Sequence, residues 1–578
     1  KTTWDGSDLA RRTGIPDAAD ASLDEDWRLL RCYMQDSLGE FPPRKGFSRY
    51  LEGRFGATEI RHVAEHQRGA FVQTILRREF LSFLQSRELA GLLENKFGSA
   101  DIRKRCCGTP RDLLLWVETQ RFWCASMARL FARLKDVGRQ VFQEQGRHGD
   151  FYTVANLGSM ATVDGFNKRR VDGIQLPHWA PTTDMQMFEE MLQPGMLESG
   201  VIISNVFAFR WAMGAGTKAG TLLYRATEDL GADLAHAEAA AGGGGAFIEA
   251  ALEAPESRRR WRKFFAEQSG LWDGGESLAQ VGVLCWTDQV LYELPEHYGM
   301  VRRLVNILSE TQVPFDIVTE ENPGDLSQYE VLLAPMLQYV DAPEIERLLD
   351  YARAGGKLVV IEPFGTHDKF ARPRTQPLLN DIRFGDLGLS SATVGRGKVL
   401  RLSAAAVPQR RSDHWNLMEE RGNDFALASE VLDPIRQEEQ ARGTDLGPAF
   451  IERIEKAFGV RLRWCPDDTD PGVYLHAYHV PSKGDRPERL VIHLVNYRMP
   501  IRVKSGAPPS TLTIATEPTP FGNLRIVMPL PAGATVKDVR AVSPTENVLY
   551  LQWTAEGGQL KVELDPLRVY QAIVADLR

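Results

Sequence analysis

The chain has 578 residues, of which 25% are charged and 43% are hydrophobic, and its formal net charge is −8. That length is too great for a single hydrophobic core, so several domains are expected. The acidic balance gives no basic footprint for nucleic acid or for a membrane surface. No apolar run approaches the ~20 residues that a membrane-spanning helix needs. A soluble protein is therefore expected, in the cytoplasm or secreted after processing.

The six cysteines include no C-x-x-C pair, which argues against a zinc site of the ribbon type. They are also too few for a disulfide scaffold in a chain of this length, and free cysteines are usually buried. We expect reduced, buried thiols. The residues imply no metal ion and no organic cofactor.

Residues 1–275 alternate helical and strand patterns, which indicates parallel α/β architecture of the barrel type. Apolar residues at helical spacing predict one long helix over 113–145. Short apolar runs predict strands, and a further helix is expected at 235–240. The strand predictions are 151–156, 173–176, 185–188 and 221–224.

Residues 278–400 form a second α/β region. The run from Tyr329 to Gly356, followed by Lys357–Ile361, has the pattern of buried strand, loop, amphipathic helix, double-glycine stop and buried strand. The alternation resembles a flavodoxin-like sheet. An amidotransferase would need a cysteine on a tight turn after a strand, but Cys285 lies inside the first strand and Met336 follows a later one. A nucleotide binder would need a glycine-rich phosphate loop, and none is present. We expect this region to serve assembly.

The remaining sequence predicts an irregular connecting region at 401–470 and a C-terminal β-sandwich at 471–578. In the second of these, short alternating apolar runs are separated by turn residues.

In parallel α/β barrels the catalytic groups lie at the carboxyl ends of the strands. Carboxyl side chains follow several apolar runs in residues 1–275 and are therefore candidates for such groups. Asp36 follows such a run, with Glu40 just beyond it, and Glu189 and Glu228 follow two others. Glycosidic cleavage needs two carboxyl groups, one that protonates the leaving group and one that attacks or stabilises the sugar cation. These four acids are the catalytic candidates, although an acid can also follow a strand by chance.

Aromatic and polar residues near these acids are candidates for binding a sugar. They are Tyr33, His178, Trp179, Tyr224, Arg225, His236 and Glu238. The alternative for the aromatic residues is core packing, since aromatic side chains bury large areas. The alternative for each lone histidine is a satisfied structural role.

The order of these parts resembles the small trimeric beta-galactosidases and related hypothetical glycoside hydrolases. The resemblance rests on Leu332–Pro335 and Ala354–Val360, then Gly365–Asp368, and His493–Tyr497 near the end. Met34–Tyr50 is similar to the related hypothetical enzymes. The resemblance to this family implies a (β/α)8-type barrel, an amidotransferase-like trimerisation domain and a C-terminal antiparallel β-sandwich.

For function, the resemblance implies a retaining O-glycoside hydrolase with a carbohydrate substrate and a homo-oligomer, either a dimer or a trimer. Glu189 would be the nucleophile, with Glu228 as its rival, and Asp36 or Glu40 would be the acid/base. Two departures stand out. The Asn-Glu pair of the family follows no strand candidate, and only about 30 residues precede the strand ending at Asp36. The first barrel units are then absent from this chain, supplied by a second chain, or degenerate. The alternative is a non-catalytic carbohydrate-binding or scaffold subunit.

Overall fold

The computed structural model of the chain describes most of residues 110–578 and a short segment before them. The described ranges are 82–87, 110–147, 151–158, 176–190, 194–197, 200–223, 229–249, 254–292, 295–375, 379, 389–409, 446–465, 472–503, 512–514, 518–545 and 550–578. The chain divides into two compact units. Unit 1 comprises 1–130, 168–175 and 369–372, and unit 2 comprises 131–167, 176–368 and 373–578.

The described part of unit 1 centres on the first half of the long helix α6 (Pro110–Glu144), which confirms the helix predicted at 113–145. Glu118 of this helix is fully buried. Arg121 donates to one of its oxygens at 2.5 Å, and Arg87 forms an ion pair with it at 2.6 Å. A buried carboxylate needs such partners, because its desolvation is costly.

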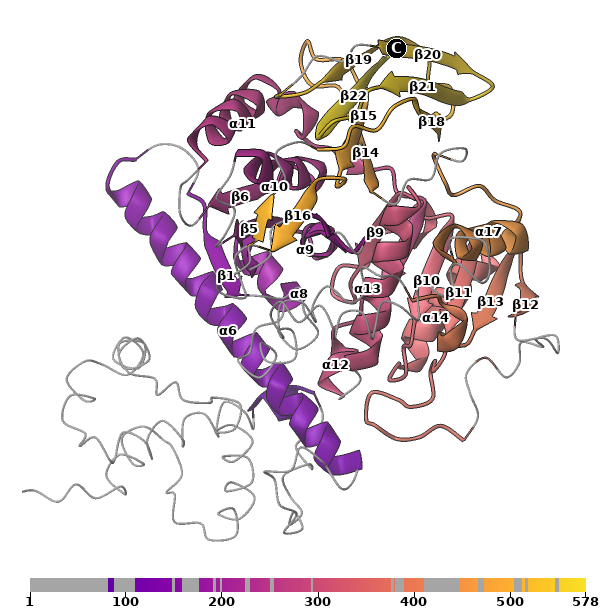
Figure 1. Cartoon of the computed structure of the whole chain (residues 1–578). Coiled ribbons are helices and arrows are strands. Elements are labelled where there is room, and N and C mark those ends of the chain that lie inside the picture. The colour runs from indigo at the N-terminus through magenta and orange to yellow at the C-terminus, as the bar shows by residue number, and fades with distance from the viewer. Residues whose placement is uncertain are drawn as a thin grey trace, which may run out of the picture. The chain divides into compact units, whose positions relative to one another are not determined.

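Among the described residues, unit 2 begins with a parallel sheet of four strands, in the order β1 (Val154–Gly158), β2 (Met185–Glu190), β5 (Lys218–Leu223) and β6 (Ala246–Glu249) (Figure 1). Strands that are consecutive in the sheet and joined by helices match the predicted alternation. Within the described residues β1 and β6 are edge strands, so closure into a (β/α)8 barrel stays a prediction.

The helices α8 (Leu176–Trp179), α9 (Val206–Gly214) and α10 (Asp229–Ala241) connect these strands. The strand predicted at 173–176 was wrong at its last residue, since Leu176 begins α8. Pro177 explains this, because proline favours the first turn of a helix. The structure does not describe 173–175.

Helix α9 is apolar around almost its whole circumference, which explains why no amphipathic pattern revealed it. Its residues from Val206 to Ala212 are all buried. The glycine run before β6 makes room for it. A Cβ on Gly242 would lie 2.6 Å from the Phe209 side chain, and one on Gly243 would lie 2.7 Å from the Met213 sulfur. The run therefore serves packing.

A six-stranded sheet forms the second α/β region, in the order β12, β13, β11, β10, β8 and β9. Its strands are β8 (Val281–Leu284), β9 (Phe315–Val318), β10 (Val331–Pro335), β11 (Lys357–Ile361), β12 (Leu389–Val394) and β13 (Gly397–Leu402). All are parallel except β12. The parallel strands have the chain order 2-1-3-4-5, which is the flavodoxin-like order predicted from the sequence.

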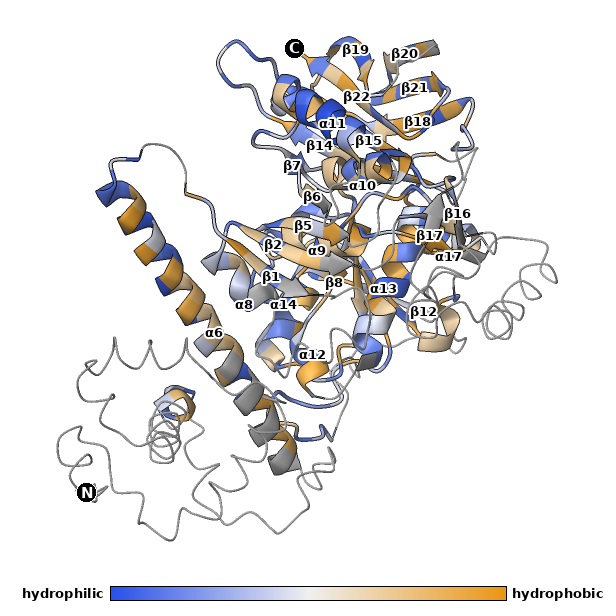
Figure 2. Ribbon diagram, turned by 60° about the vertical axis from the view of Figure 1, so that its left-hand side comes forward, coloured by the Kyte–Doolittle hydropathy of each residue, from blue (hydrophilic) through white to orange (hydrophobic). Residues whose placement is uncertain are grey.

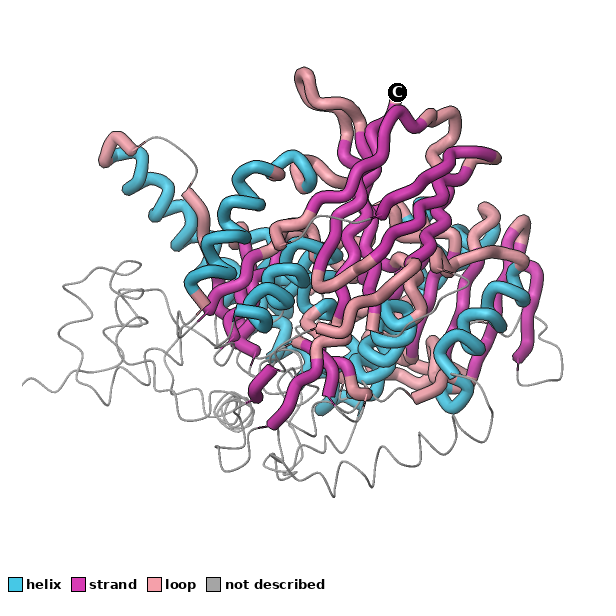
Figure 3. Tube along the Cα trace, turned by 45° about the horizontal axis from the view of Figure 1, so that its top comes forward, coloured by secondary structure: helices cyan, strands magenta, loops and turns pink. Residues whose placement is uncertain are grey.

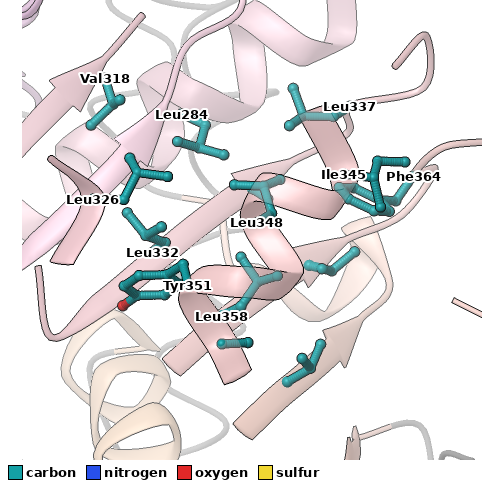
Figure 4. Close-up of a cluster of buried hydrophobic side chains, with 14 of the residues drawn as sticks. Leu284, Val318, Leu326, Leu332, Leu337, Ile345, Leu348, Tyr351, Leu358 and Phe364 are labelled. Atoms are coloured by element: carbon teal, nitrogen blue, oxygen red, sulfur yellow. The ribbon is translucent and has the colours of Figure 1, made fainter. Parts of the chain in front are cut away.

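Two helices of this region are α13 (Pro295–Glu310) and α14 (Ala342–Arg353). Ile345, Leu348 and Tyr351 of α14 point toward the strand residues Leu332 and Leu358 (Figure 4). The strands are buried on both faces and therefore read as continuous apolar runs, which is why their positions could be predicted.

Two antiparallel sheets at the end of the chain pack face to face, which confirms the predicted β-sandwich (Figure 3). One has the order β19 (Val536–Val542), β22 (Tyr570–Leu577), β15 (Arg489–Asn496), β14 (Val473–Val480), β7 (Glu276–Ser277). The other has the order β18 (Leu524–Pro529), β21 (Gln559–Asp565), β20 (Tyr550–Glu556). Alternate residues of β14, β15, β18 and β21 form the shared core.

Several elements cross the boundaries expected from the sequence. Strand β7, just before the second α/β region, pairs with β14 of the sandwich. Strand β16 (Pro500–Val503) pairs with β3 (Gly195–Leu197), which in turn pairs with β4 (Ile202–Ile203), and β17 (Leu512–Ile514) completes that sheet. Helix α17 (Leu446–Phe458) lies in the stretch expected to be irregular.

Helix α11 (Pro255–Glu267) is strongly basic and appears mostly blue in Figure 2. Hydrogen bonds to α10 anchor it all the same. Asp233 of α10 accepts hydrogen bonds from Ser257 (2.6 Å), Arg260 (2.7 Å) and Trp261 (2.9 Å). The three described free cysteines, Cys124, Cys285 and Cys465, are buried, as predicted.

A buried ion pair joins α9, β9 and β14. Arg210 of α9, whose side chain is 1% exposed, lies 3.3 Å from Asp316 of β9. Its Nη2 also lies 2.5 Å from Nδ1 of His476 in β14. Arginine has no acceptor, so Nδ1 of His476 must accept. His476 is therefore neutral with its proton on Nε2, and burial lowers its pKa well below the usual value.

Replacing Arg210 with methionine is expected to destabilise the protein by about 3–5 kcal/mol, because Asp316, whose side chain is only 15% exposed, would lose its cation. Urea unfolding of the purified protein measures the loss. The matched control is Arg259→Ala, which removes the exposed pair with Glu256 and should cost less than about 1 kcal/mol. The double variant Arg210→Met/Asp316→Asn should recover part of the loss. Equal costs for Arg210→Met and Arg259→Ala would contradict this account.

Candidate functional site

The carboxyl edge of the four-stranded sheet brings the ends of β2, β5 and β6 together. Glu189 pairs in register with Leu222 of β5, and Glu190 pairs with Leu223, which pairs in turn with Glu249 of β6. In parallel α/β proteins this edge is where substrates bind and catalytic groups gather. The backbone thus places the predicted nucleophile Glu189 one residue before the end of its strand.

Six of the predicted site residues lie outside the described residues. They are Tyr33, Asp36, Glu40, Tyr224, Arg225 and Glu228. Tyr224 and Arg225 follow directly on β5, which ends at Leu223. Their roles stay predictions.

His178 and Trp179 come before β2, whereas Glu189 lies near its far end. Four residue steps along a strand, from Met185 to Glu189, span roughly 13 Å. Trp179 is 2% exposed, and its ring centroid lies 4.4 Å from that of Phe131. Nε2 of His178 lies 3.5 Å from the Glu321 carboxylate. The structure therefore does not bring these two residues to the carboxyl edge of the sheet.

His236 of α10 lies between two aromatic rings. Its ring stacks on Trp261 with centroids 5.5 Å apart, and it meets Phe247 edge to face at 4.8 Å. Burial, together with Arg258 and Arg262, lowers its pKa to about 3. A neutral imidazole with 8% exposure packs here like an aromatic side chain, which is the structural alternative stated for it.

Glu238, two residues further along α10, accepts three hydrogen bonds through its two carboxylate oxygens. Its Oε1 accepts from the backbone N–H of Asn205 at 2.8 Å and from the Tyr497 hydroxyl at 2.8 Å. Its Oε2 accepts from Nδ2 of Asn205 at 2.9 Å. Burial raises the pKa of Glu238 to about 7, although these three donors act in the opposite direction. Neither Asn205 nor Tyr497 could be found from the sequence, because they lie 33 and 259 residues away.

The crevice where the flavodoxin-like strand order reverses, between β8 and β10, is filled by side chains. Gln289 and Tyr339 exchange hydrogen bonds of 2.7 and 2.9 Å, and the rings of Tyr292 and Tyr339 stack with centroids 4.3 Å apart. His297 accepts from the Trp286 N–H at 3.0 Å. Ligands usually bind at this point of such sheets, but here protein groups occupy it.

Met336 follows β10 on a tight turn with a left-handed backbone, φ 49°. An amidotransferase would present its cysteine on such a turn. A thioether has no proton to give to a base, so Met336 cannot serve as that nucleophile. Burial raises the pKa of the Cys285 thiol well above its usual value, which keeps it protonated and unreactive.

A pocket of about 540 Å³ lies at the opposite, amino-terminal ends of β10 and β11. Its lining includes Tyr329, Glu330, Tyr351 and Lys357. Lys357 and Glu330 form an ion pair of 3.0 Å there. The pocket lies at the end of the sheet where parallel α/β proteins do not carry their chemistry.

Among the described residues, no group of three or more potential ligands could hold a metal ion. Within the same part of the chain, no helix combines the length and the apolar character needed to cross a membrane.

Residues 295–376 match the family model described as the beta-galactosidase trimerisation domain. This match confirms, for that part of the chain, the resemblance to the small trimeric beta-galactosidases. It spans α13, β9, β10, α14 and β11. No curated protein matches the chain in a sequence comparison.

Several solved structures are similar to the chain. A beta-galactosidase from Bacillus circulans sp. alkalophilus is 13% identical over 92% of this chain and 76% of its own, with a TM-score of 0.47. A beta-galactosidase from the Antarctic haloarchaeon Halorubrum lacusprofundi is 15% identical over 76% of each chain, with a TM-score of 0.48. Alpha-L-fucosidase isoenzyme 2 from Paenibacillus thiaminolyticus is 13% identical, covers 82% of this chain and 81% of its own, and has a TM-score of 0.42. TM-scores below 0.5 at such identities do not establish a shared fold.

The raised pKa of Glu238 predicts a pH dependence of stability. The folded protein holds this proton up to pH about 7, whereas the ordinary value is 4.5. Its contribution to stability is therefore complete below pH about 4.5 and is lost as the pH rises through about 7. The difference in melting temperature between wild type and Glu238→Gln should shrink, or change sign, across this range, as followed by calorimetry.

Buried histidines change the stability with pH in the opposite direction, both in wild type and in Glu238→Gln. Burial lowers the pKa of His297 to about 4 and that of His493 to about 3, so their contributions are lost as the pH falls below about 6.5. They cancel in the difference between the two proteins. A difference that stays constant from pH 4.5 to 8 would show that Glu238 does not titrate in this range.

Proposed function

We propose that the chain is a glycoside hydrolase of the beta-galactosidase type that cleaves O-glycosidic bonds with retention of configuration. The observation that carries the proposal is the family match of residues 295–376. It receives support from the register of β2, which ends in the two acids Glu189 and Glu190 at the carboxyl edge of a parallel sheet.

In the proposed mechanism the Glu189 carboxylate attacks the anomeric carbon and forms a covalent glycosyl-enzyme. A second carboxyl group, on Asp36 or Glu40, donates its proton to the glycosidic oxygen as that bond breaks. The same group then removes a proton from water, which attacks the anomeric carbon and releases Glu189. Glu228 is the alternative nucleophile. Tyr33, Tyr224 and Arg225 are proposed to contact the sugar.

The second α/β region is proposed to join copies of the chain into a homotrimer. Support comes from the printed description of the matching family and from the filled crevice between β8 and β10. A domain whose own ligand crevice is occupied is available for assembly. The proposed partners are a carbohydrate substrate and two further copies of this chain.

Replacing Glu189 with glutamine is expected to lower the hydrolysis of a nitrophenyl β-galactoside on the order of 10³-fold or more, because the nucleophile is lost. Steady-state kinetics on a panel of aryl glycosides measure the effect. The matched control is Glu190→Gln, which changes the next acid of the same strand. Glu228→Gln tests the rival in the same assay.

Three outcomes separate the alternatives. Unchanged activity in Glu189→Gln would contradict its role, and a large loss only in Glu228→Gln would transfer the role to that residue. If wild type hydrolyses none of the glycosides and yet binds sugar, the chain is the non-catalytic carbohydrate-binding subunit.

Light scattering coupled to gel filtration is expected to give three times the mass of the chain, since the matched family is a trimerisation domain. The interface would involve the second α/β region, so hydrogen exchange in residues 295–376 should slow as the concentration rises and the trimer forms. A monomer or a dimer at every concentration would contradict the proposed assembly.

A further inference from the structure

The buried carboxylate of Glu238 joins segments that are far apart along the chain. Asn205 ends the connection that follows β2 and precedes the first residue of α9. Tyr497 directly follows β15 of the C-terminal sandwich. All three residues are buried, with exposures of 1% for Glu238, 3% for Asn205 and 0% for Tyr497. One carboxylate thus holds α10, the start of α9 and the sandwich together.

The connection after β2 has a second attachment to the same region. The Met196 N–H donates to the carbonyl of Met499 at 2.9 Å, and β3 pairs with β16. Tyr497 is itself held in place, because its N–H donates to the Gly472 carbonyl at 2.7 Å and its ring lies 4.4 Å from that of Tyr474. Two described segments of the chain between β2 and α9, 194–197 and 200–205, are therefore attached to residues near the end of β15 and in β16.

We infer that Glu238 is a positioning residue: through Asn205 and Tyr497 it fixes the connection that leaves the carboxyl end of β2, and so the backbone at Glu189. This inference rests on the proposed function for its catalytic consequence. In this role Glu238 does not contact substrate, since it is 1% exposed and its hydrogen bonds are made inside the protein. The sequence predicts that Glu238 binds the sugar, whereas the role inferred from the structure is to position the backbone.

The atoms of the cluster call for a glutamate at this position. Oε1 accepts two donors and Oε2 accepts the amide nitrogen of Asn205. In Glu238→Gln the new NH2 group would face the NH2 group of Asn205, so one hydrogen bond is replaced by two opposed donors. The reciprocal double variant Glu238→Gln/Asn205→Asp restores the pattern, because the glutamine amide can then donate to the aspartate.

Hydrogen exchange at pH 8, with no substrate present, tests the cluster directly. In Glu238→Gln the peptide that covers residues 201–212 should exchange on the order of 10-fold faster than in wild type, since the side-chain amide of Asn205 loses its acceptor and the backbone of this segment opens more often. The double variant should return the exchange toward the wild-type rate. Tyr497→Phe should raise it by a smaller factor.

The matched control is Asp233→Asn on the same helix. Asp233 is 2% exposed and also accepts three hydrogen bonds, but these come from α11. Its loss should lower the melting temperature without changing the exchange of 201–212. Equal exchange in Glu238→Gln and wild type, or no rescue by the double variant, would overturn the inference.

Kinetics on the nitrophenyl β-galactoside test the catalytic consequence. A misplaced nucleophile lowers kcat on the order of 10- to 10²-fold, so Glu238→Gln should lower kcat with little change in KM, and the double variant should restore it. A rise in KM alone would mean that Glu238 binds the sugar and would overturn the positioning role. If wild type hydrolyses no glycoside, the proposed function fails, while the exchange experiment still decides whether Glu238 holds the connection.

Discussion

The guanidinium of Arg210 is buried, so its charge must be compensated by protein groups. Its partners come from two other parts of the chain, the second α/β region and the C-terminal sandwich. Its guanidinium is 1% exposed, and it contacts Asp316 of β9 and His476 of β14. Asp316 is held in turn by Ser277 at 2.8 Å and by Tyr329 at 3.2 Å. An unpaired buried charge is costly enough that α9, the second α/β region and the sandwich are constrained to one arrangement.

Helix α9 is the element through which this constraint reaches the proposed site. Its first residues follow Asn205, which Glu238 holds, and its last residue lies against β9. A Cβ on Gly214 would lie 1.9 Å from the carbonyl oxygen of Ile317, so only glycine allows this approach. Asn322 then donates to the Gly214 carbonyl at 3.0 Å. The second α/β region thus contacts α9, the helix between β2 and β5, directly.

The sequence revealed elements whose burial follows a simple rule and missed those whose burial depends on distant partners. Strands β9, β10 and β11 could be predicted because both faces are buried. Helix α9 could not, since it is apolar around nearly all of its surface. Glu189 was predicted from its position after an apolar run, and its catalytic role stays a prediction. The role of Glu238 was not, because a carboxylate in an alanine-rich stretch carries no local sign of Tyr497, 259 residues further on.

The second α/β region has the strand order of a ligand-binding fold, but side chains occupy the crevice where such folds bind ligands. Gln289, Tyr339 and His297 fill the point where such sheets bind ligands, and Met336 occupies the turn of a nucleophile. The hydrogen bonds between Gln289 and Tyr339 join the segments that follow β8 and β10. The end of neighbouring β9 then offers Thr319 and Asn322 to the Gly214 carbonyl. The second α/β region thereby supports the last turn of α9 through the end of β9.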